Sequence, residues 1–350
     1  MNNRGIEVIK TGFSVNIEND FKISKKINAY IPTEKNIKLL AKIGEEIINK
    51  SEGSYILSGA YGSGKSFFIS VLLNLFSIRN KNEIGVFLER AEKKFPLLKT
   101  YNKLNNDKYL VVFARDRFFS FEKAILHGIL DTIKKENLKI NLNIESEIIL
   151  KKIEDWEKNN SNIIEKFSLR FLKKKWNIEY LKVELKKNKN SAIKEFKEAY
   201  KDIFYGEDFI NYEAYLDITK LLLNFEEEVL NKTEYKGIIY VFDEFGRYLE
   251  SNINKLDIKE VQDMAEYCNS DNSSFMFLVT HKDIFQYTNK LNKQDNIFEW
   301  EKVAGRLKKE QLFYDKVTAL SILSYSVYKT EEFKNFKNKN LDAFNKYKKI

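Results

Sequence analysis

The sequence predicts an α/β fold in which helices flank a central, mainly parallel five-stranded sheet, with a large helical insertion. Three observations support this fold class. A glycine-rich loop at residues 59–66 joins an apolar strand pattern to an apolar helix pattern. Another apolar run, at 237–242, ends in two adjacent carboxylates. Strand patterns alternate with helical ones along the chain, and this alternation is typical of parallel sheets.

The composition of the 350-residue chain is that of a folded protein, with room for one large domain or two smaller ones. Apolar residues make up 43% of it and aromatic residues 14%, which argues against disorder. No run approaches the roughly 18 apolar residues that a membrane span needs, so we expect no membrane association. Cys268 is the only cysteine, which excludes an intramolecular disulfide and favours a reducing cytoplasm. A structural zinc site is also disfavoured, because the chain has only two histidines besides this one cysteine.

The net charge of +9 gives modest support to a DNA partner. Only eight of the 60 basic residues are arginine, and lysine, asparagine and isoleucine are used heavily, as in proteins of AT-rich bacterial genomes. Solvated lysine is therefore the default interpretation of this charge. Each arginine is correspondingly more informative.

The N-terminal residues 1–34 are polar and irregular, and we expect them to form an extension of the main domain. A helix is predicted over 37–48, where apolar residues recur at helical spacing and Thr33 stands at the N-cap position. The apolar segment 54–58 then indicates a short buried strand.

The phosphate-binding pattern G-x-x-x-x-G-K-[ST] is matched at every fixed position by residues 59–66, Gly-Ala-Tyr-Gly-Ser-Gly-Lys-Ser. The flanking strand and the apolar helix over 67–76 are the context that this motif requires. Glycines let the backbone approach a polyphosphate, and amides at the start of a helix attract its negative charge. We expect Lys65 to reach the β- and γ-phosphates and Ser66 to bind Mg²⁺. The alternative, a glycine-rich turn before an ordinary helix, is disfavoured by the flanks.

The motif predicts a P-loop NTPase that binds ATP and Mg²⁺, with residues 35–315 as its ATPase domain. The residues expected to hold the nucleotide are Gly59, Ala60, Tyr61, Gly62, Ser63, Gly64, Lys65, Ser66 and Phe67.

A second buried strand is indicated at 108–114, followed by Arg115 and Arg117 and by a helical pattern over 121–134. Ligands of parallel sheets bind at the carboxyl ends of strands. The two arginines therefore contact either a phosphate or a partner chain, or they belong to a solvated turn.

Between about 138 and 230 the strand patterns disappear, and charged helical periodicity indicates a helical insertion. Its segment 170–201 has eleven Lys and Arg against four Glu, interleaved with Trp176, Tyr180 and Tyr200. These residues suit a DNA-facing surface, with lysines on phosphates and aromatic rings alongside. A bundle with solvated lysines on its outer face is the alternative, and we favour it.

The apolar run 237–242 indicates a buried strand that ends in Asp243 and Glu244, a Walker B pattern. We expect Asp243 to hold Mg²⁺, usually through water, and Glu244 to orient and polarise an attacking water. Lys65 and Glu244 are thus candidate catalytic residues. A surface strand ending in acids is the alternative. The acid pair favours hydrolysis over a nucleotide kinase, because no motif indicates an acceptor site.

Two further strands are indicated beyond this pattern. The first, 275–279, is followed by Thr280 and His281. The second, 310–314, is preceded by Gly305, Arg306 and Leu307. Another of the rare arginines, Arg247, lies just beyond the acid pair, three positions after Glu244.

The order of these parts resembles the AAA+/ORC-like branch of additional-strand P-loop ATPases. The stretches 55–67, 241–249 and 278–283 are similar to large ATPases of bacterial anti-phage defence, such as BREX-type proteins. This resemblance implies ATP and Mg²⁺, homo-oligomerisation through ATP sites, and work on DNA or on partner proteins of a defence system. The 178 positions between Lys65 and Asp243 exceed what a compact AAA+ core needs, in line with an insertion.

The resemblance also implies roles for three of these residues. Thr280 takes the place of the "sensor 1" residue that contacts the water or the γ-phosphate. His281 is the second choice for this role, or else caps the following helix. Arg306 is a candidate arginine finger or sensor, in its own site or a neighbour's. Residues 316–350 are expected to begin a helical lid that either continues in a longer protein or is unusually small.

These observations predict a cytoplasmic, Mg²⁺-dependent AAA+-like ATPase that drives or gates an assembly in bacterial antiviral defence. The alternative is a nucleotide-gated switch or scaffold with little turnover, which signals to an effector or binds DNA.

Overall fold

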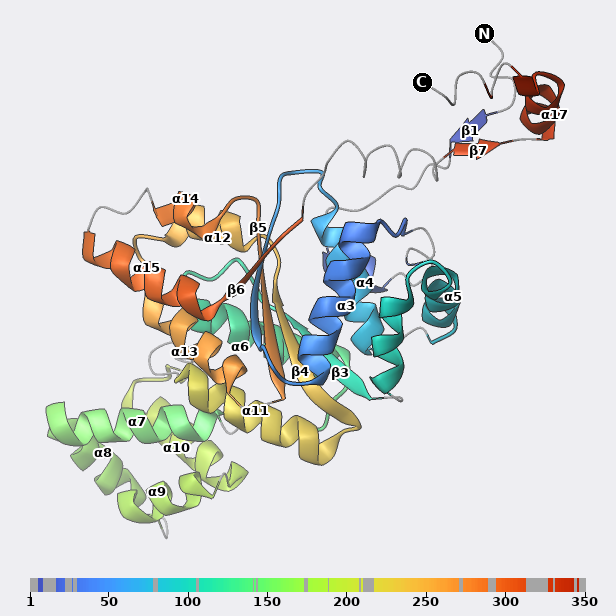
Figure 1. Cartoon of the computed structure of the whole chain (residues 1–350). Coiled ribbons are helices and arrows are strands. Elements are labelled where there is room, and N and C mark those ends of the chain that lie inside the picture. Colours follow the sequence, from blue (N-terminus) through green and yellow to red (C-terminus); the bar gives the residue numbers. More distant parts are fainter. Residues whose placement is uncertain are drawn as a thin grey trace.

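The computed structural model of the chain describes residues 6–8, 17–22, 27, 30–77, 81–104, 107–140, 142, 144–172, 176–187, 189–207, 209, 217–270, 273–288, 294–312, 327–329, 331–342 and 345. Five parallel strands form a central sheet with helices on both faces (Figure 1). The predicted α/β class and the predicted flanked five-stranded sheet are confirmed.

The sheet has the order β3-β4-β5-β2-β6, and each neighbouring pair runs parallel. Its strands are β2 (Ser54–Ser58), β3 (Lys108–Phe113), β4 (Tyr235–Phe242), β5 (Ser274–Thr280) and β6 (Lys308–Gln311). Strand β5 therefore lies between β2 and β4, with Ser58 opposite Thr280 and Phe242 opposite Leu278. The segments that follow these three strands consequently meet at one edge of the sheet.

Alternate residues of each strand enter two different cores, as the period of two in a strand requires. On β4, Ile239 and Val241 face one core, whereas Ile238, Tyr240 and Phe242 face the other. Both faces are buried, which explains the continuous apolar runs of the sequence.

Each face of the sheet has its own set of helices (Figure 1). One face is covered by α3 (Glu34–Ile48), α4 (Lys65–Ser77), α5 (Lys81–Glu92) and the 3-10 helix η1 (Pro96–Leu104). The other is covered by α6 (Phe121–Lys135), α11 (Ile218–Lys232), α12 (Phe245–Asn252), α13 (Ile258–Asn269), α14 (Ile284–Thr288) and α15 (Gln294–Arg306).

The predicted N-terminal extension contributes a helix to the main core, which its polar composition did not indicate. Helix α1 (Ile17–Lys22) buries Ile17 and Phe21, four positions apart on one helix face. The Phe21 carbonyl accepts a hydrogen bond from Asn74 of α4 at 3.3 Å, and the Phe21 ring lies 5.8 Å from that of Phe113. These contacts attach α1 to the carboxyl end of β3.

The region between β3 and β4 contains a small helical bundle with a separate core. The bundle consists of α7 (Ile144–Asn159), α8 (Ser161–Phe171), α9 (Ile178–Lys186) and α10 (Asn190–Ile203), and it lies below the sheet in Figure 1. Trp156, Phe167 and Phe196 stack within its core. The next helix, α11, belongs instead to the core of the sheet, where Leu222 and Phe225 are fully buried.

The edge strand β6 begins two residues before the predicted position, because its sequence is charged rather than apolar. Lys308 pairs with Glu46 and Glu52, and Glu310 pairs with Lys42. Charged side chains are typical of edge strands, and they hide such strands from a search for apolar runs.

Beyond β6, the described residues form a strand pair that the sequence did not predict and a helix within the range expected to begin a helical lid. Strand β7 (Val327–Lys329) pairs antiparallel with β1 (Ile6–Val8), and α17 (Glu331–Lys339) follows it. Figure 1 shows this pair away from the central sheet. Residues 316–326 of the expected lid lie outside the described residues.

The start of β2 tests the packing of the sheet most simply. A Cβ added at Gly53 would lie 1.6 Å from the backbone oxygen of Cys268, so Gly53→Ala forces β2 away from α13. We expect a loss of about 3 kcal/mol in the free energy of unfolding, measured by urea denaturation.

The control for this variant is Gly85→Ala in α5, where no atom lies within 4 Å of the added Cβ. Alanine should stabilise this helical position by about 0.5–1 kcal/mol. Equal midpoints for the two variants would contradict the packing described for Gly53.

Candidate functional site

The loop between β2 and α4 has the backbone conformation that its glycines predict. Gly62 and Gly64 have positive φ angles of 78° and 83°, which residues with a Cβ adopt only at a cost. No atom lies within 4 Å of the position that a Cβ would take at either glycine. The amides of the first turn of α4, from Lys65 onward, have no acceptor within the helix. The loop is therefore an open cradle of backbone at a helix N-terminus, as an anion site requires.

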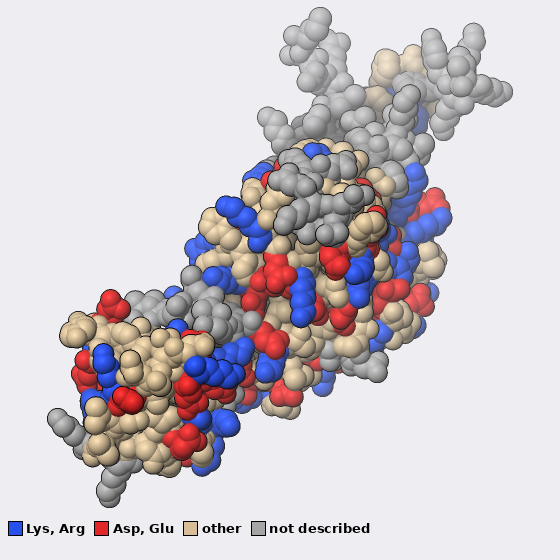
Figure 2. All heavy atoms as spheres, turned by 90° about the vertical axis from the view of Figure 1, so that its left-hand side faces the viewer, with Lys and Arg blue, Asp and Glu red and all other residues tan. Residues whose placement is uncertain are grey.

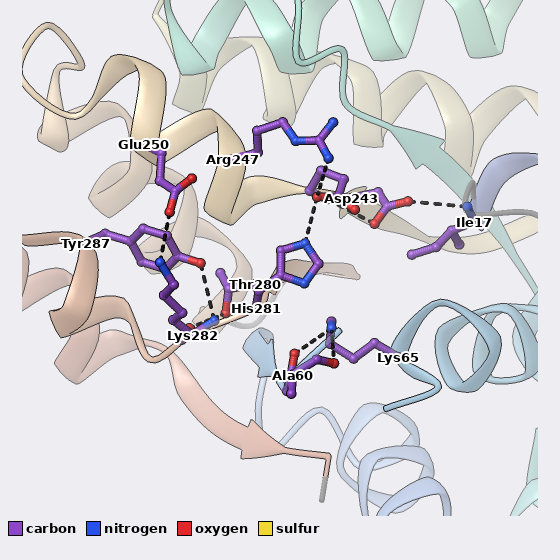
Figure 3. Close-up of polar contacts among 12 residues, drawn as sticks. Ile17, Ala60, Lys65, Asp243, Arg247, Glu250, Thr280, His281, Lys282 and Tyr287 are labelled. Carbon is purple, nitrogen blue, oxygen red and sulfur yellow. Dashed lines mark hydrogen bonds and ion pairs between the residues drawn. The ribbon is translucent and has the colours of Figure 1, made fainter. Parts of the chain in front are cut away.

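The Lys65 side chain is buried and folds back onto this loop. Its Nζ donates to the carbonyl oxygens of Gly59 at 2.5 Å and Ala60 at 3.0 Å (Figure 3). Burial lowers the pKa of Lys65, while the carboxylates of Glu244 and Asp243 act in the opposite direction. Within the described part of the chain, this buried ammonium bonds only to backbone carbonyls and has no carboxylate in contact, which suits it to bind an anionic ligand.

The other loop residues differ in their surroundings. The Ser63 hydroxyl is buried without a hydrogen-bond partner among the described residues, and Ser66 lies in the first turn of α4. Phe67 faces the core, where its ring packs edge-on against Tyr30 with centroids 5.0 Å apart. Tyr61 is 72% exposed, and its ring stacks on His281.

Asp243 follows β4 and is held by backbone amides. Its Oδ1 accepts from the amide of Glu244 at 2.9 Å, and its Oδ2 accepts from the amide of Ile17 at 3.3 Å. Burial raises the pKa of Asp243 to about 6, although both amides and the charge of Lys65 act to lower it. A bound cation would relieve this burial penalty, so the carboxylate fits the role of a metal-site residue.

Glu244 has a left-handed backbone, with a φ of 58° and a ψ of 28°, at the start of α12. Such a conformation costs a residue other than glycine about 1–3 kcal/mol and persists where the surroundings impose it. One carboxylate oxygen, Oε2, contacts His281 Nε2 at 2.8 Å and the guanidinium of Arg247 at 3.8 Å. In the view of Figure 3, the ring of His281 lies between Asp243 and Lys65.

Thr280, the expected sensor, lies at the carboxyl end of β5 opposite Ser58. It is fully buried, and its hydroxyl donates to the carbonyl of Lys282 at 2.8 Å. The next residue, His281, is the one whose side chain reaches Glu244. The sequence ranked it second because residue type alone does not indicate which side chain turns toward the acids.

Arg306 is placed apart from the other predicted site residues. It ends α15, two residues before β6 begins, and therefore lies at the amino edge of the sheet. Its guanidinium pairs with Glu266 at 2.5 Å and bonds to the Lys302 carbonyl at 2.8 Å. The phosphate loop follows the carboxyl edge, so Arg306 does not complete this site within one chain. A role in a neighbour's site stays a prediction.

Arg115 is bound to acids of its own chain. Its guanidinium donates to Glu18 of α1 at 2.6 Å and to Asp131 at 2.7 Å. Glu18 also pairs with Lys135, and despite its burial these two cations lower its pKa to about 2. The arginine thus anchors α1, whose first amide contacts Asp243. Arg117 is exposed, with its guanidinium 5.1 Å from the ring of Phe118.

The basic segment 170–201 has many of its described charges paired within the bundle. Arg170 pairs with Asp202, Lys182 with Glu157 and Glu179, Lys187 with Glu184, and Lys197 with Glu145. Figure 2 shows basic and acidic side chains interspersed on one face of the molecule. Residues 173–175, the densest basic run, lie outside the described residues. The paired charges are what a solvated bundle surface would show.

No model of a protein family matches this sequence, and no curated protein or solved structure is significantly similar to it. None of the helices in the described ranges is both long and apolar enough to cross a bilayer. Across the same residues, no three His, Cys, Asp or Glu side chains gather as a metal-binding group.

The raised pKa of Asp243 predicts a pH-dependent effect of Asp243→Asn on stability in metal-free buffer. Above pH 6 the native carboxylate is ionised in a partly buried position, so its removal should stabilise the fold by roughly 1–3 kcal/mol. The gain should shrink as the pH falls through 6, because Asp243 then protonates in the folded state, and vanish near pH 4. Urea denaturation of both proteins at pH 8 and pH 4.5 measures it. A difference that is the same at both pH values would contradict the burial penalty.

Proposed function

We propose that this chain binds ATP with Mg²⁺ and hydrolyses it. One observation carries the proposal: an open glycine cradle with a buried lysine lies across the end of β5 from two adjacent carboxylates. Phosphoryl transfer to water requires these parts, because its catalysis consists mainly of positioning and charge neutralisation.

The described residues fit a nucleotide and its metal ion. The open cradle at Gly62 and Gly64 leaves room for a polyphosphate, and the nearby Ser63 hydroxyl has no hydrogen-bond partner among the described residues. Lys65 would exchange the two loop carbonyls for phosphate oxygens. Ser66 and Asp243 would hold Mg²⁺, which supplies charge neutralisation when bound.

Glu244 has the position for a residue that orients the attacking water. Its Oε2 contacts two basic groups, whereas no described residue bonds to its Oε1. An ionised carboxylate with one such oxygen can accept a hydrogen bond from water. Glu244 is therefore the catalytic residue of this proposal, and Asp243 is the metal-site residue.

The strand order supports the narrower proposal of an AAA+-like ATPase. A strand, β5, is added between the phosphate-loop strand and the strand that ends in acids, as the name of the additional-strand class implies. Membership would further imply ATP-dependent homo-oligomers that drive or gate an assembly in antiviral defence, in the cytoplasm. Arg247, 64% exposed and 3.8 Å from Glu244, suits contact with a phosphate or a neighbouring subunit better than Arg306 does.

The second candidate is a nucleotide-gated switch with little turnover, and the N-terminal helix favours it. The first amide of α1 donates a hydrogen bond to the Asp243 carboxylate, and the ion pair of Glu18 with Arg115 holds α1 in place. Binding of a metal and nucleotide at the site would then shift the position of α1. A partner bound to the N-terminal segment would respond to that shift. DNA binding remains a further proposal with less support, because many of the described lysines are paired.

Substitutions at two positions separate binding from hydrolysis. Lys65→Ala should lose nucleotide binding, since it removes the cation of the cradle. Glu244→Gln should keep the affinity within about threefold and lower kcat by about 100-fold or more, as expected for loss of the water-orienting group. Affinity is measured with a fluorescent ATP analogue and kcat by phosphate release.

Glu250→Gln is the matched control, because Glu250 lies on the same helix and pairs at the surface with Lys282. It should leave both quantities unchanged. Equal turnover in Glu244→Gln and the parent protein would rule out the role assigned to Glu244.

Steady-state turnover with and without duplex DNA separates the motor from the switch. A substantial basal rate that DNA or a partner accelerates is expected for an ATPase that drives an assembly. Negligible turnover together with ATP-dependent exposure of residues 17–22 to protease would favour the switch instead.

A further inference from the structure

A continuous contact joins the phosphate loop to the acid that follows β4. The Tyr61 ring lies parallel to the His281 ring, with centroids 3.7 Å apart and an interplanar angle of 22°. His281 in turn contacts Glu244 through Nε2 at 2.8 Å. Tyr61 of the loop, His281 after β5 and Glu244 after β4 therefore contact one another in a row. They can do so because β5 lies between β2 and β4.

The hydrogen bond defines how His281 holds the carboxylate. An ionised carboxylate can only accept a hydrogen bond, so in this pair the imidazole N–H at Nε2 is the donor and Oε2 the acceptor. This bond holds Oε2 while Oε1 has no bond from any described residue. The imidazole therefore fixes the carboxylate by one oxygen and leaves the other for a ligand.

None of the described residues holds the His281 ring by its second nitrogen, Nδ1, which leaves this task to Tyr61. Nδ1 of His281 is buried and has no hydrogen-bond partner among the described residues. Functional histidines are usually oriented by a bond to this second nitrogen. With that bond missing, the stacked ring of Tyr61 is the contact from the phosphate loop that sets the plane of the imidazole.

We propose that His281 is a positioning residue for Glu244, and that Tyr61 couples the imidazole to the conformation of the phosphate loop. This inference rests on the proposed hydrolysis and deepens it. When nucleotide fills the loop, any movement of Tyr61 is transmitted through the stack to the carboxylate. The alignment of the acid therefore depends on the conformation of the loop that would hold the nucleotide.

The left-handed backbone of Glu244 fits this assignment. Glu244 is the residue directly before α12, and its backbone conformation determines the direction of its side chain. The free-energy cost of this conformation must be balanced by contacts in the folded state. His281 and Arg247 supply contacts to the carboxylate. Arg247 is too distant for a hydrogen bond at 3.8 Å, so His281 is the group that orients the acid.

Phosphate release and nucleotide affinity in a set of variants test this proposal. His281→Ala should lower kcat by about 10–100-fold, as loss of an orienting partner typically does, with the ATP-analogue affinity within about twofold. His281→Gln, which keeps an amide donor, should recover part of the rate. Tyr61→Ala should lower kcat by about 2–12-fold, which corresponds to the interaction energy of one aromatic pair. Tyr61→Phe, which keeps the ring, should lower kcat less. The control is Tyr205→Ala, which removes a tyrosine that is 97% exposed on the bundle and should leave kcat and affinity unchanged.

The Glu244→Gln background separates positioning from direct contact with nucleotide. If His281 acts through Glu244, then His281→Ala should add nothing to Glu244→Gln in either kcat or affinity. Weaker nucleotide binding on adding His281→Ala to Glu244→Gln would instead make His281 a phosphate contact and overturn the proposal.

Failure of the inference is distinguishable from failure of the proposed function. A rate that depends on Glu244 but not on His281 overturns only the positioning role. A rate independent of both residues overturns the proposed hydrolysis at this site. If His281→Ala does not fold, Tyr61→Ala still tests the coupling, because Tyr61 lies largely in solvent, and a rate equal to that of the parent would contradict it.

Discussion

The position of β5 between β2 and β4 is the constraint on which the rest of this site depends. Parallel strands end at a common edge, and here that edge collects the phosphate loop, the acid pair and His281 from segments far apart in the chain. The order is stabilised by two cores, because each strand buries alternate residues against helices of opposite faces. The helical bundle of α7–α10 has its own core and leaves this arrangement intact.

Two buried or partly buried charges at this edge, on Lys65 and Asp243, are the main electrostatic feature of the proposed site. Lys65 is buried against backbone carbonyls, and burial penalises the ionised form of Asp243. Among the described residues, neither charge has an oppositely charged partner in direct contact, which would suit a ligand that supplies one, such as a phosphate at the lysine and a cation at the aspartate. The strained backbone of Glu244 adds a cost that contacts at the same edge must balance.

The sequence predicted what apolar runs and glycines determine. The strands that became β2 to β5 are buried on both faces, so each is a continuous apolar run. Gly62 and Gly64 of the loop have positive φ angles that only glycine adopts freely. What escaped prediction depends on tertiary contact. The amide of Ile17 on Asp243 joins segments 226 residues apart, β6 is charged because it is an edge, and the hydrogen bond of His281 depends on how the chain turns after β5. Arg306 looked suitable by order along the chain, but the direction of β6 puts it at the opposite edge of the sheet.

The central claim is that this edge of the sheet hydrolyses ATP with Mg²⁺. The most direct measurement is the release of γ-phosphate from labelled ATP by the purified chain, with Mg²⁺ present and with the ion removed by EDTA. The account predicts release that requires Mg²⁺ and that saturates with ATP. Bound ATP that stays intact for many hours in Mg²⁺, or release that is equally fast in EDTA, would contradict it.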